Sequence, residues 1–123
     1  MNQETYQNRP TMAKWNELVQ AVGRMPKIAT GSYSGTGTYG SGNRNTIHIG
    51  FVPKIVFLQQ SDPGRPGCVS WIYGFPSGVA LNDSNAGIVT LVWDGTSLSW
   101  YSVNSANDQL NLSGRTYHWV ALG

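Results

Sequence analysis

The 123-residue sequence has a single cysteine, few charged residues and no long apolar run. One thiol, Cys68, cannot form an intrachain disulfide or a thiolate metal site, and we expect it to be a buried structural residue. No run approaches the roughly 18 apolar residues of a transmembrane helix, so no membrane insertion is expected. Residues 1–10 are polar and lack the apolar segment of a secretory signal, which predicts synthesis in the cytoplasm without a signal peptide.

Charged residues make up only 11% of the chain, against about 25% in an ordinary soluble domain. The net charge is +2, and the basic residues are spread singly along the sequence. Without a basic stripe to neutralise phosphates, a nucleic-acid partner is not expected. Gly, Ser, Thr and Asn take the place of charge, and such a neutral surface suits packing against other subunits or uncharged partners.

One segment, residues 11–25, has the pattern of a helix. Thr11 can cap its N-terminus, and Pro26 ends it. Four apolar residues repeat at the a/d spacing of a coiled-coil seam: Trp15, Leu18, Val22 and Met25. A helix this short is marginal alone in water, so its stripe must pack on its own domain or on copies of itself. We therefore expect residues 1–26 to form a polar arm with an oligomerising or packing helix, and residues 27–123 to form a separate domain.

The chain after Pro26 has the periodicity of strands. Strands are predicted at residues 28–33, 46–51, 54–60, 68–75 and 115–122, and on both sides of Asp94-Gly95, a hairpin signal. The glycine-rich residues 31–42 precede no helix and are expected to be a loop rather than a phosphate cradle. Residues 76–87 are expected to be a loop with a short extended piece. The prediction is an all-β fold, an antiparallel β-sandwich of six to eight strands preceded by one short helix.

The closing strand carries apolar bulk on both faces. Tyr117, Trp119 and Ala121 share one face, while His118, Val120 and Leu122 share the other. This pattern predicts a strand that is covered on both sides, either by a second sheet or by a neighbouring subunit.

Aromatic rings beside amides are the residue types that recognise sugars, because a ring covers the apolar C–H face of a pyranose while amides bond its hydroxyls. Two clusters fit, although core packing is the ordinary fate of such rings. The first is "SWIYGF", with Trp71 and Tyr73, and the second is "SWYSVNSANDQ". The candidate ligand-binding residues are Trp71, Tyr73, Trp100, Tyr101, Asn104, Asn107, Asp108, Gln109 and Arg115.

Catalytic signatures are missing from the sequence. A glycosidase needs two carboxylates at a fixed separation, whereas Asp62, Asp83 and Asp94 stand in turn-like contexts. There is no G-x-S-x-G and no H-E-x-x-H motif. We predict that the protein is not an enzyme and has no catalytic residues.

Two stretches, "FVPKIVFLQ" (51–59) and the closing "YHWVALG" (117–123), resemble the opening and final strands of the H-type lectin family. They also resemble lectin-like tip domains of bacteriophage tail fibres, common in phages and prophages of Gram-positive gut bacteria, and the likeness spans residues 27–123. It implies a β-sandwich that forms a homotrimer and binds carbohydrate, with sugar contacts from residue types matched by Trp100, Tyr101 and Arg115. The H-x-H metal pattern of some fibre tips is absent, since only His48 stands there, and neither metal nor cofactor is expected.

The expected function is therefore a phage tail receptor-binding domain that recognises host cell-surface carbohydrate, located in the virion tail beside other tail proteins. Two alternatives stay open. The sandwich could serve assembly alone, as in a virion structural or decoration protein, or its tip loops could bind a protein receptor.

Overall fold

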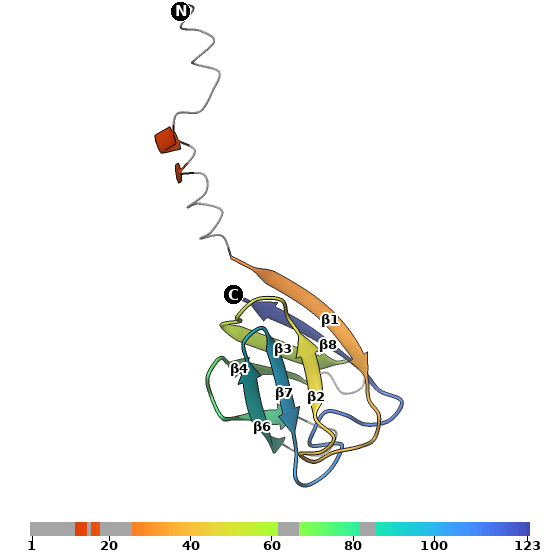
Figure 1. The fold of residues 1–123 in the computed structure, drawn as a ribbon. Helices are drawn as coiled ribbons and strands as arrows, with labels where there is room; N and C mark the ends of the chain where they lie inside the picture. Colours follow the sequence, from red (N-terminus) through yellow and green to blue (C-terminus); the bar gives the residue numbers. More distant parts are fainter. Residues whose placement is uncertain (1–11, 15, 18–25, 62–66, 82–85) are drawn as a thin grey trace, which may run out of the picture.

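The described residues of the computed structural model, 12–14, 16–17, 26–61, 67–81 and 86–123, contain eight strands in two antiparallel four-stranded sheets (Figure 1). Sheet A has the strand order β1-β8-β3-β4, and sheet B has the order β2-β7-β6-β5. The predicted antiparallel β-sandwich is confirmed. The strands are β1 (Ile28–Ser34), β2 (Asn45–His48), β3 (Ile55–Gln60), β4 (Cys68–Ile72), β5 (Ser77–Leu81), β6 (Ala86–Asp94), β7 (Ser97–Tyr101) and β8 (Thr116–Leu122).

The closing strand β8 lies inside sheet A, between β1 and β3. Tyr117, Trp119 and Ala121 are buried against sheet B, as the alternation predicts. The chain end is tied to the start of β1 by two backbone hydrogen bonds between Lys27 and Gly123, of 3.0 and 2.9 Å. The aromatic residues 117 and 119 therefore belong to an interior strand of a sheet.

The two segments that carry the family resemblance are neighbours in this sheet. Ile55 of β3 pairs with Leu122 of β8, and the Lys54 amide donates to the Leu122 carbonyl at 2.6 Å. The Phe51 ring lies on Gly123, where an added Cβ would come within 2.5 Å of ring carbons. The two sequence motifs thus form one packing unit at one end of sheet A.

Four aromatic rings fill the centre of the sandwich. Tyr33 stacks on Tyr117 with centroids 5.0 Å apart and meets Trp100 edge-on, and Trp100 in turn contacts Trp71 at 5.1 Å. Each polar atom of these rings has a partner: the Tyr33 hydroxyl donates to the Leu110 carbonyl at 2.7 Å, and the Trp71 indole donates to the Val79 carbonyl at 3.0 Å. Burying each such ring contributes about 1.5–3 kcal/mol.

Sequence periodicity located most of the strands, but it did not predict that the Cys68 side chain is exposed. The hairpin at Asp94-Gly95 is confirmed, with Gly95 at φ 58° between β6 and β7, and the short extended piece expected within 76–87 is strand β5. Cys68 was expected to be buried and is exposed, because it lies on the same side of β4 as Ser70 and Ile72 while Val69 and Trp71 face the core.

A short helix does precede the sandwich, since residues 12–14 and 16–17 are helical. The seam residues predicted to drive oligomerisation, Trp15, Leu18, Val22 and Met25, lie outside the described residues.

Tyr33 makes folding stability sensitive to alkaline pH. Burial, reinforced by the neighbouring Tyr117, raises the pKa of the Tyr33 hydroxyl far above its ordinary value near 10. Above pH 10 the unfolded chain loses this proton while the folded chain keeps it, so the free energy of unfolding should fall by up to about 1.4 kcal/mol per pH unit. Urea unfolding between about pH 8 and pH 11 measures this slope. The Tyr33→Phe variant should be less stable at neutral pH, but its free energy of unfolding should fall less steeply between about pH 8 and pH 11, because the Tyr33 proton is gone. A fall as steep as in the wild type would contradict the attribution to Tyr33.

Candidate functional site

Trp100 and Gln109 are structural residues, which corrects their expected role as ligand contacts. Trp100 is 0% exposed, and its indole N–H donates to the Gln109 carbonyl at 2.8 Å. Both side chains face inward because Trp100 alternates with the outward Tyr101 on β7, while Gln109 points back toward the 35–45 loop. Neither side chain can touch a ligand in the folded protein.

The buried Gln109 amide holds two loops together through four hydrogen bonds. Its oxygen accepts from the Gly40 and Ser102 amides at 3.0 and 2.9 Å. Its nitrogen donates to the Asn43 carbonyl and to the Asn45 Oδ1, each at 2.8 Å. All donors and acceptors of the amide are satisfied, so this side chain fixes the 35–45 loop against the loop that follows β7.

Asn111 makes a second such link, which sequence reasoning missed. Its side chain is buried and bonds to Thr36, Thr38 and Asn45. Between the two amides stands Leu110, buried in the core with φ 58°, a left-handed conformation that costs a non-glycine residue about 1–2 kcal/mol. With this left-handed backbone conformation, the Leu110 side chain points into the core while the Gln109 and Asn111 amides on either side of it face the 35–45 loop.

The remaining loop candidates stay near the surface but enclose no pocket among those described. Tyr101 is half-buried, and the Arg44 guanidinium lies over its ring at 5.3 Å. Asn104 is exposed and Asn107 is half-buried. The half-buried Asp108 side chain lies against Gly87, where an added Cβ would come within 2.6 Å.

Arg115 is half-buried, and its backbone carbonyl accepts from the Gly35 amide at 2.8 Å. It stands at the entry to β8, next to the fixed 35–45 loop. Two candidates of the second aromatic cluster, Trp100 and Gln109, are therefore buried, and the others lie at or near the surface.

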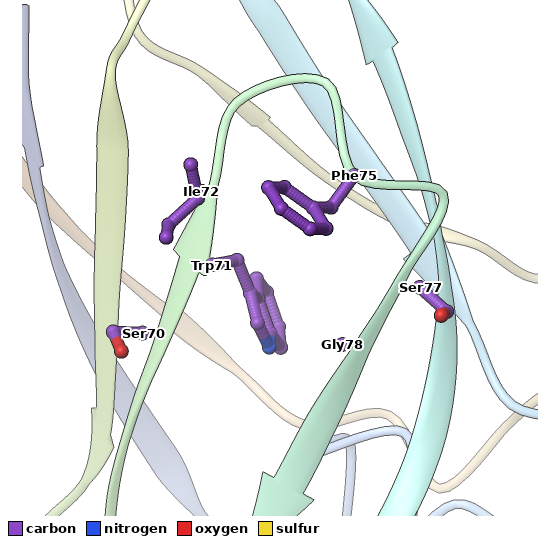
Figure 2. A pocket seen from close by; sticks show the side chains of 6 residues that line it. All are labelled: Ser70, Trp71, Ile72, Phe75, Ser77 and Gly78. Carbon is purple, nitrogen blue, oxygen red and sulfur yellow. The ribbon is translucent and has the colours of Figure 1, made fainter.

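Part of the first aromatic cluster, residues 70–75, lines a pocket. A pocket of about 140 Å³ opens where the edge strands β4 and β5 meet. Figure 2 shows the Trp71 indole between the two strands, the Phe75 ring beside it, and Gly78 across from the indole. The lining residues are Ser70, Trp71, Ile72, Phe75, Ser77 and Gly78.

A single strand over the predicted range 68–75 would place Trp71, Tyr73 and Phe75 on one face by alternation, and the structure separates them. Strand β4 ends at Ile72, so the alternation stops there and a turn with Gly74 at φ 91° follows. Trp71 is buried, whereas Tyr73 and Phe75 are exposed. Tyr73 lies against Trp93, at 5.3 Å between ring centroids, outside the pocket lining.

The turn that carries Phe75 is fixed from several sides. Its amide donates to the Ile72 carbonyl at 3.2 Å, and its carbonyl accepts from the Trp93 indole at 2.8 Å. The Tyr73 amide donates to Lys54, and the Leu91 amide donates to Pro76. The backbone at Phe75 is therefore held by hydrogen bonds, while its side chain is 57% exposed.

The pocket has the chemistry for a neutral ring. No charged residue lines it, the buried Trp71 indole forms its floor, and the exposed Phe75 ring stands beside that indole (Figure 2). A cavity of about 150 Å³ is known to hold one benzene ring. The space therefore accommodates one six-membered ring with an apolar face.

The described ranges show neither a metal-binding cluster nor a membrane-spanning helix. These residues include no cluster of three or more His, Cys, Asp or Glu that could hold a metal ion. None of the helical residues described belongs to a helix long and apolar enough to cross a membrane. No protein family, curated protein or solved structure matches the chain.

The amide of Gln109 should matter for stability and not for ligand contact. Gln109→Ala leaves several buried donors and acceptors unpaired, and we expect a loss of about 2–4 kcal/mol in the free energy of unfolding. Asn104→Ala, at an exposed position in the same loop, should change it by less than about 0.5 kcal/mol. Denaturant unfolding of both variants makes the comparison, and equal effects would refute the structural role.

Proposed function

We propose that this protein is a non-enzymatic receptor-binding domain of a phage tail that recognises cell-surface carbohydrate, and that the β4–β5 pocket holds one sugar ring. The observation that carries the proposal is this pocket, in which an exposed aromatic ring stands beside a buried one and no lining residue is charged. The assignment to a phage tail depends on the resemblance of residues 51–59 and 117–123 to tail-fibre tip domains. Strands β3 and β8 from these two segments pair in one sheet, which explains why the two motifs would occur together.

Phe75, which is 57% exposed, would act as the apolar platform for the C–H face of a pyranose. Trp71 is only 2% exposed, and its indole N–H donates to the Val79 carbonyl, so this ring would form the buried floor of the pocket. The Ser70 and Ser77 hydroxyls point away from the indole (Figure 2), so the contact would depend mainly on the Phe75 ring.

Affinity for a single site should be low. A monosaccharide of about 12 non-hydrogen atoms at about 0.3 kcal/mol per atom gains about 4 kcal/mol, a Kd on the order of 1 mM. Useful attachment then needs several copies of the domain acting together, which gives a homotrimer a functional reason.

A second candidate is a virion structural or decoration protein that uses the sandwich for assembly alone. The outer face of sheet A favours it, because Ile28, Ile72 and Val120 are exposed there. A protein receptor is a third possibility, with an apolar side chain of the receptor occupying the same pocket.

Phe75→Ala tests the leading proposal without touching the core. We expect the full-length protein to bind bacterial wall polysaccharides or common saccharides on a glycan array, and the variant to lose about tenfold in affinity, or about 1.4 kcal/mol. The matched control is Tyr39→Ala, which removes another exposed ring in the 35–45 loop.

Three results would count against this proposal. Silence of the wild type across the array would remove the carbohydrate ligand. Equal losses in both variants would remove the pocket as its site. Binding of a purified surface protein that Phe75→Ala abolishes would support the protein-receptor alternative instead.

A further inference from the structure

Strand β1 is an edge of sheet A, and no described strand pairs with its outer side (Figure 1). At its two ends, Lys27 bonds to Gly123 and Gly35 bonds to Arg115 through the backbone, which fixes the alternation of the ladder between β1 and β8. Every second residue of β1 therefore bonds to β8, and the others direct their N–H and C=O groups to the open edge. These other residues are Ile28, Thr30, Ser32 and Ser34.

The β1 sequence lacks the features that keep an edge strand from pairing. Natural edge strands carry charged side chains, proline or a bulge that prevents another strand from adding to them. Strand β1, IATGSYS, contains no charged residue and no proline, and its seven residues pair with β8 in unbroken register. It is also the longest of the four edge strands described, since β2 has four residues and β4 and β5 have five each.

The two sides of the sandwich differ in how the sheets meet. On one side the edge strands β4 and β5 contact each other, whereas on the other side β1 and β2 do not. The inward residues of β1, which are Ala29, Gly31 and Tyr33, are accordingly only half-buried, although the inward residues of the neighbouring β8 are buried. The inner side of β1 is therefore reachable from its edge.

This open side also holds an unused hydrogen-bond donor. Trp71, Trp93 and Trp100 each donate their indole N–H to a backbone carbonyl. Trp119 is only 7% exposed, and its indole N–H has no acceptor among the described residues. Because no fully buried side-chain nitrogen in the described part of the chain lacks a partner, the Trp119 N–H must reach the surface.

Gly31 places that donor at the edge of β1. It lies across from Trp119 in the ladder, and its missing side chain makes room for the indole, because an added Cβ would lie 2.7 Å from the indole nitrogen. The Trp119 N–H is therefore on the inner side of β1, at the middle of the strand. A residue opposite Gly31 in an added strand would direct its side chain to this same inner side.

We propose that the β1 edge binds an extended segment of another protein, which adds to sheet A as a fifth strand. The backbone of the segment pairs with the outward N–H and C=O groups of β1, as in other cases of strand addition. Opposite Gly31 the segment carries Ser, Thr, Asn or Gln, whose side-chain oxygen accepts from the Trp119 indole. A saccharide could accept from that indole, but it would leave the alternating backbone donors and acceptors of the edge unpaired.

The β1 strand of a second copy does not meet these requirements. In an antiparallel pair of two β1 edges, the residue opposite Gly31 is again an inward one, because outward backbone groups pair with outward backbone groups. The inward residues are Ala29, Gly31 and Tyr33. Only Tyr33 carries a side-chain oxygen, and its hydroxyl is bonded to the Leu110 carbonyl at 2.7 Å. The Trp119 donor therefore selects a segment of different sequence.

Proline substitution tests the edge in the full-length chain. Thr30→Pro removes a backbone N–H that points away from β8, so sheet A keeps its own ladder while an added strand loses a bond and meets the proline ring. The matched control is Thr30→Val, which keeps this N–H and is β-branched like threonine. Ser32→Pro repeats the test at the next outward position. Near-ultraviolet circular dichroism confirms that each variant is folded.

The probe is a displayed library of random peptides about ten residues long, selected on the immobilised wild-type protein. We expect the selected peptides to share Ser, Thr, Asn or Gln at one position. Their affinity should fall at least about tenfold for both proline variants and less than about twofold for Thr30→Val. In NMR spectra of the wild type, the Trp119 indole N–H should shift on binding and exchange more slowly with solvent, since it gains an acceptor.

Several results would overturn the proposal. A library without binders, or peptides that bind both proline variants as tightly as the wild type, would remove the edge as a peptide site. A multimer that dissociates in Thr30→Pro would show that a second copy occupies the edge. A saccharide that shifts the Trp119 indole signal and binds Thr30→Pro undiminished would make this a sugar site.

The β1 site does not depend on the proposed function. Phe75→Ala alters the pocket at β4 and β5, on the other side of the sandwich, and should bind the selected peptides like the wild type. A silent glycan array with intact peptide binding therefore refutes only the proposed function.

Discussion

The position of β8 between β1 and β3 is the constraint from which the rest of the structure follows. Its inward residues, Tyr117 and Trp119, are part of the aromatic centre of the core. Because side chains alternate along a strand, the same pairing forces His118, Val120 and Leu122 onto the opposite side. A strand that is apolar on both faces therefore gives a closed core on one side and leaves apolar side chains on the outer side.

Amides in this protein serve structure more than recognition. Gln109 and Asn111 are buried, fully hydrogen-bonded, and hold the glycine-rich 35–45 loop in a single conformation. Neutral amides suit this work because one side chain satisfies both donors and acceptors at close range. The candidate binding chemistry lies elsewhere, at the edge where β4 and β5 meet.

The sequence predicted the fold class and most strands because period-two alternation and the Asp94-Gly95 turn are local signals. The site was predicted less well. Of the predicted candidates, Trp71 lines the β4–β5 pocket and Tyr73 does not, and no local pattern shows that β4 ends at Ile72 and leaves Phe75 exposed. Nor can a sequence distinguish Gln109, three of whose four side-chain hydrogen bonds reach residues more than 60 positions away, from an amide that faces solvent. Side-chain roles set by distant contacts require coordinates.

Native-state hydrogen exchange of the β8 amides tests the central claim most directly. If β8 is the interior of sheet A, the amides of residues 117–121 should exchange only through global unfolding, with the same free energy that denaturant unfolding reports. Exchange of these amides at rates close to those of an unstructured peptide would contradict the account, because neither the core, the pocket edge nor the outer face would then have a fixed strand to build on.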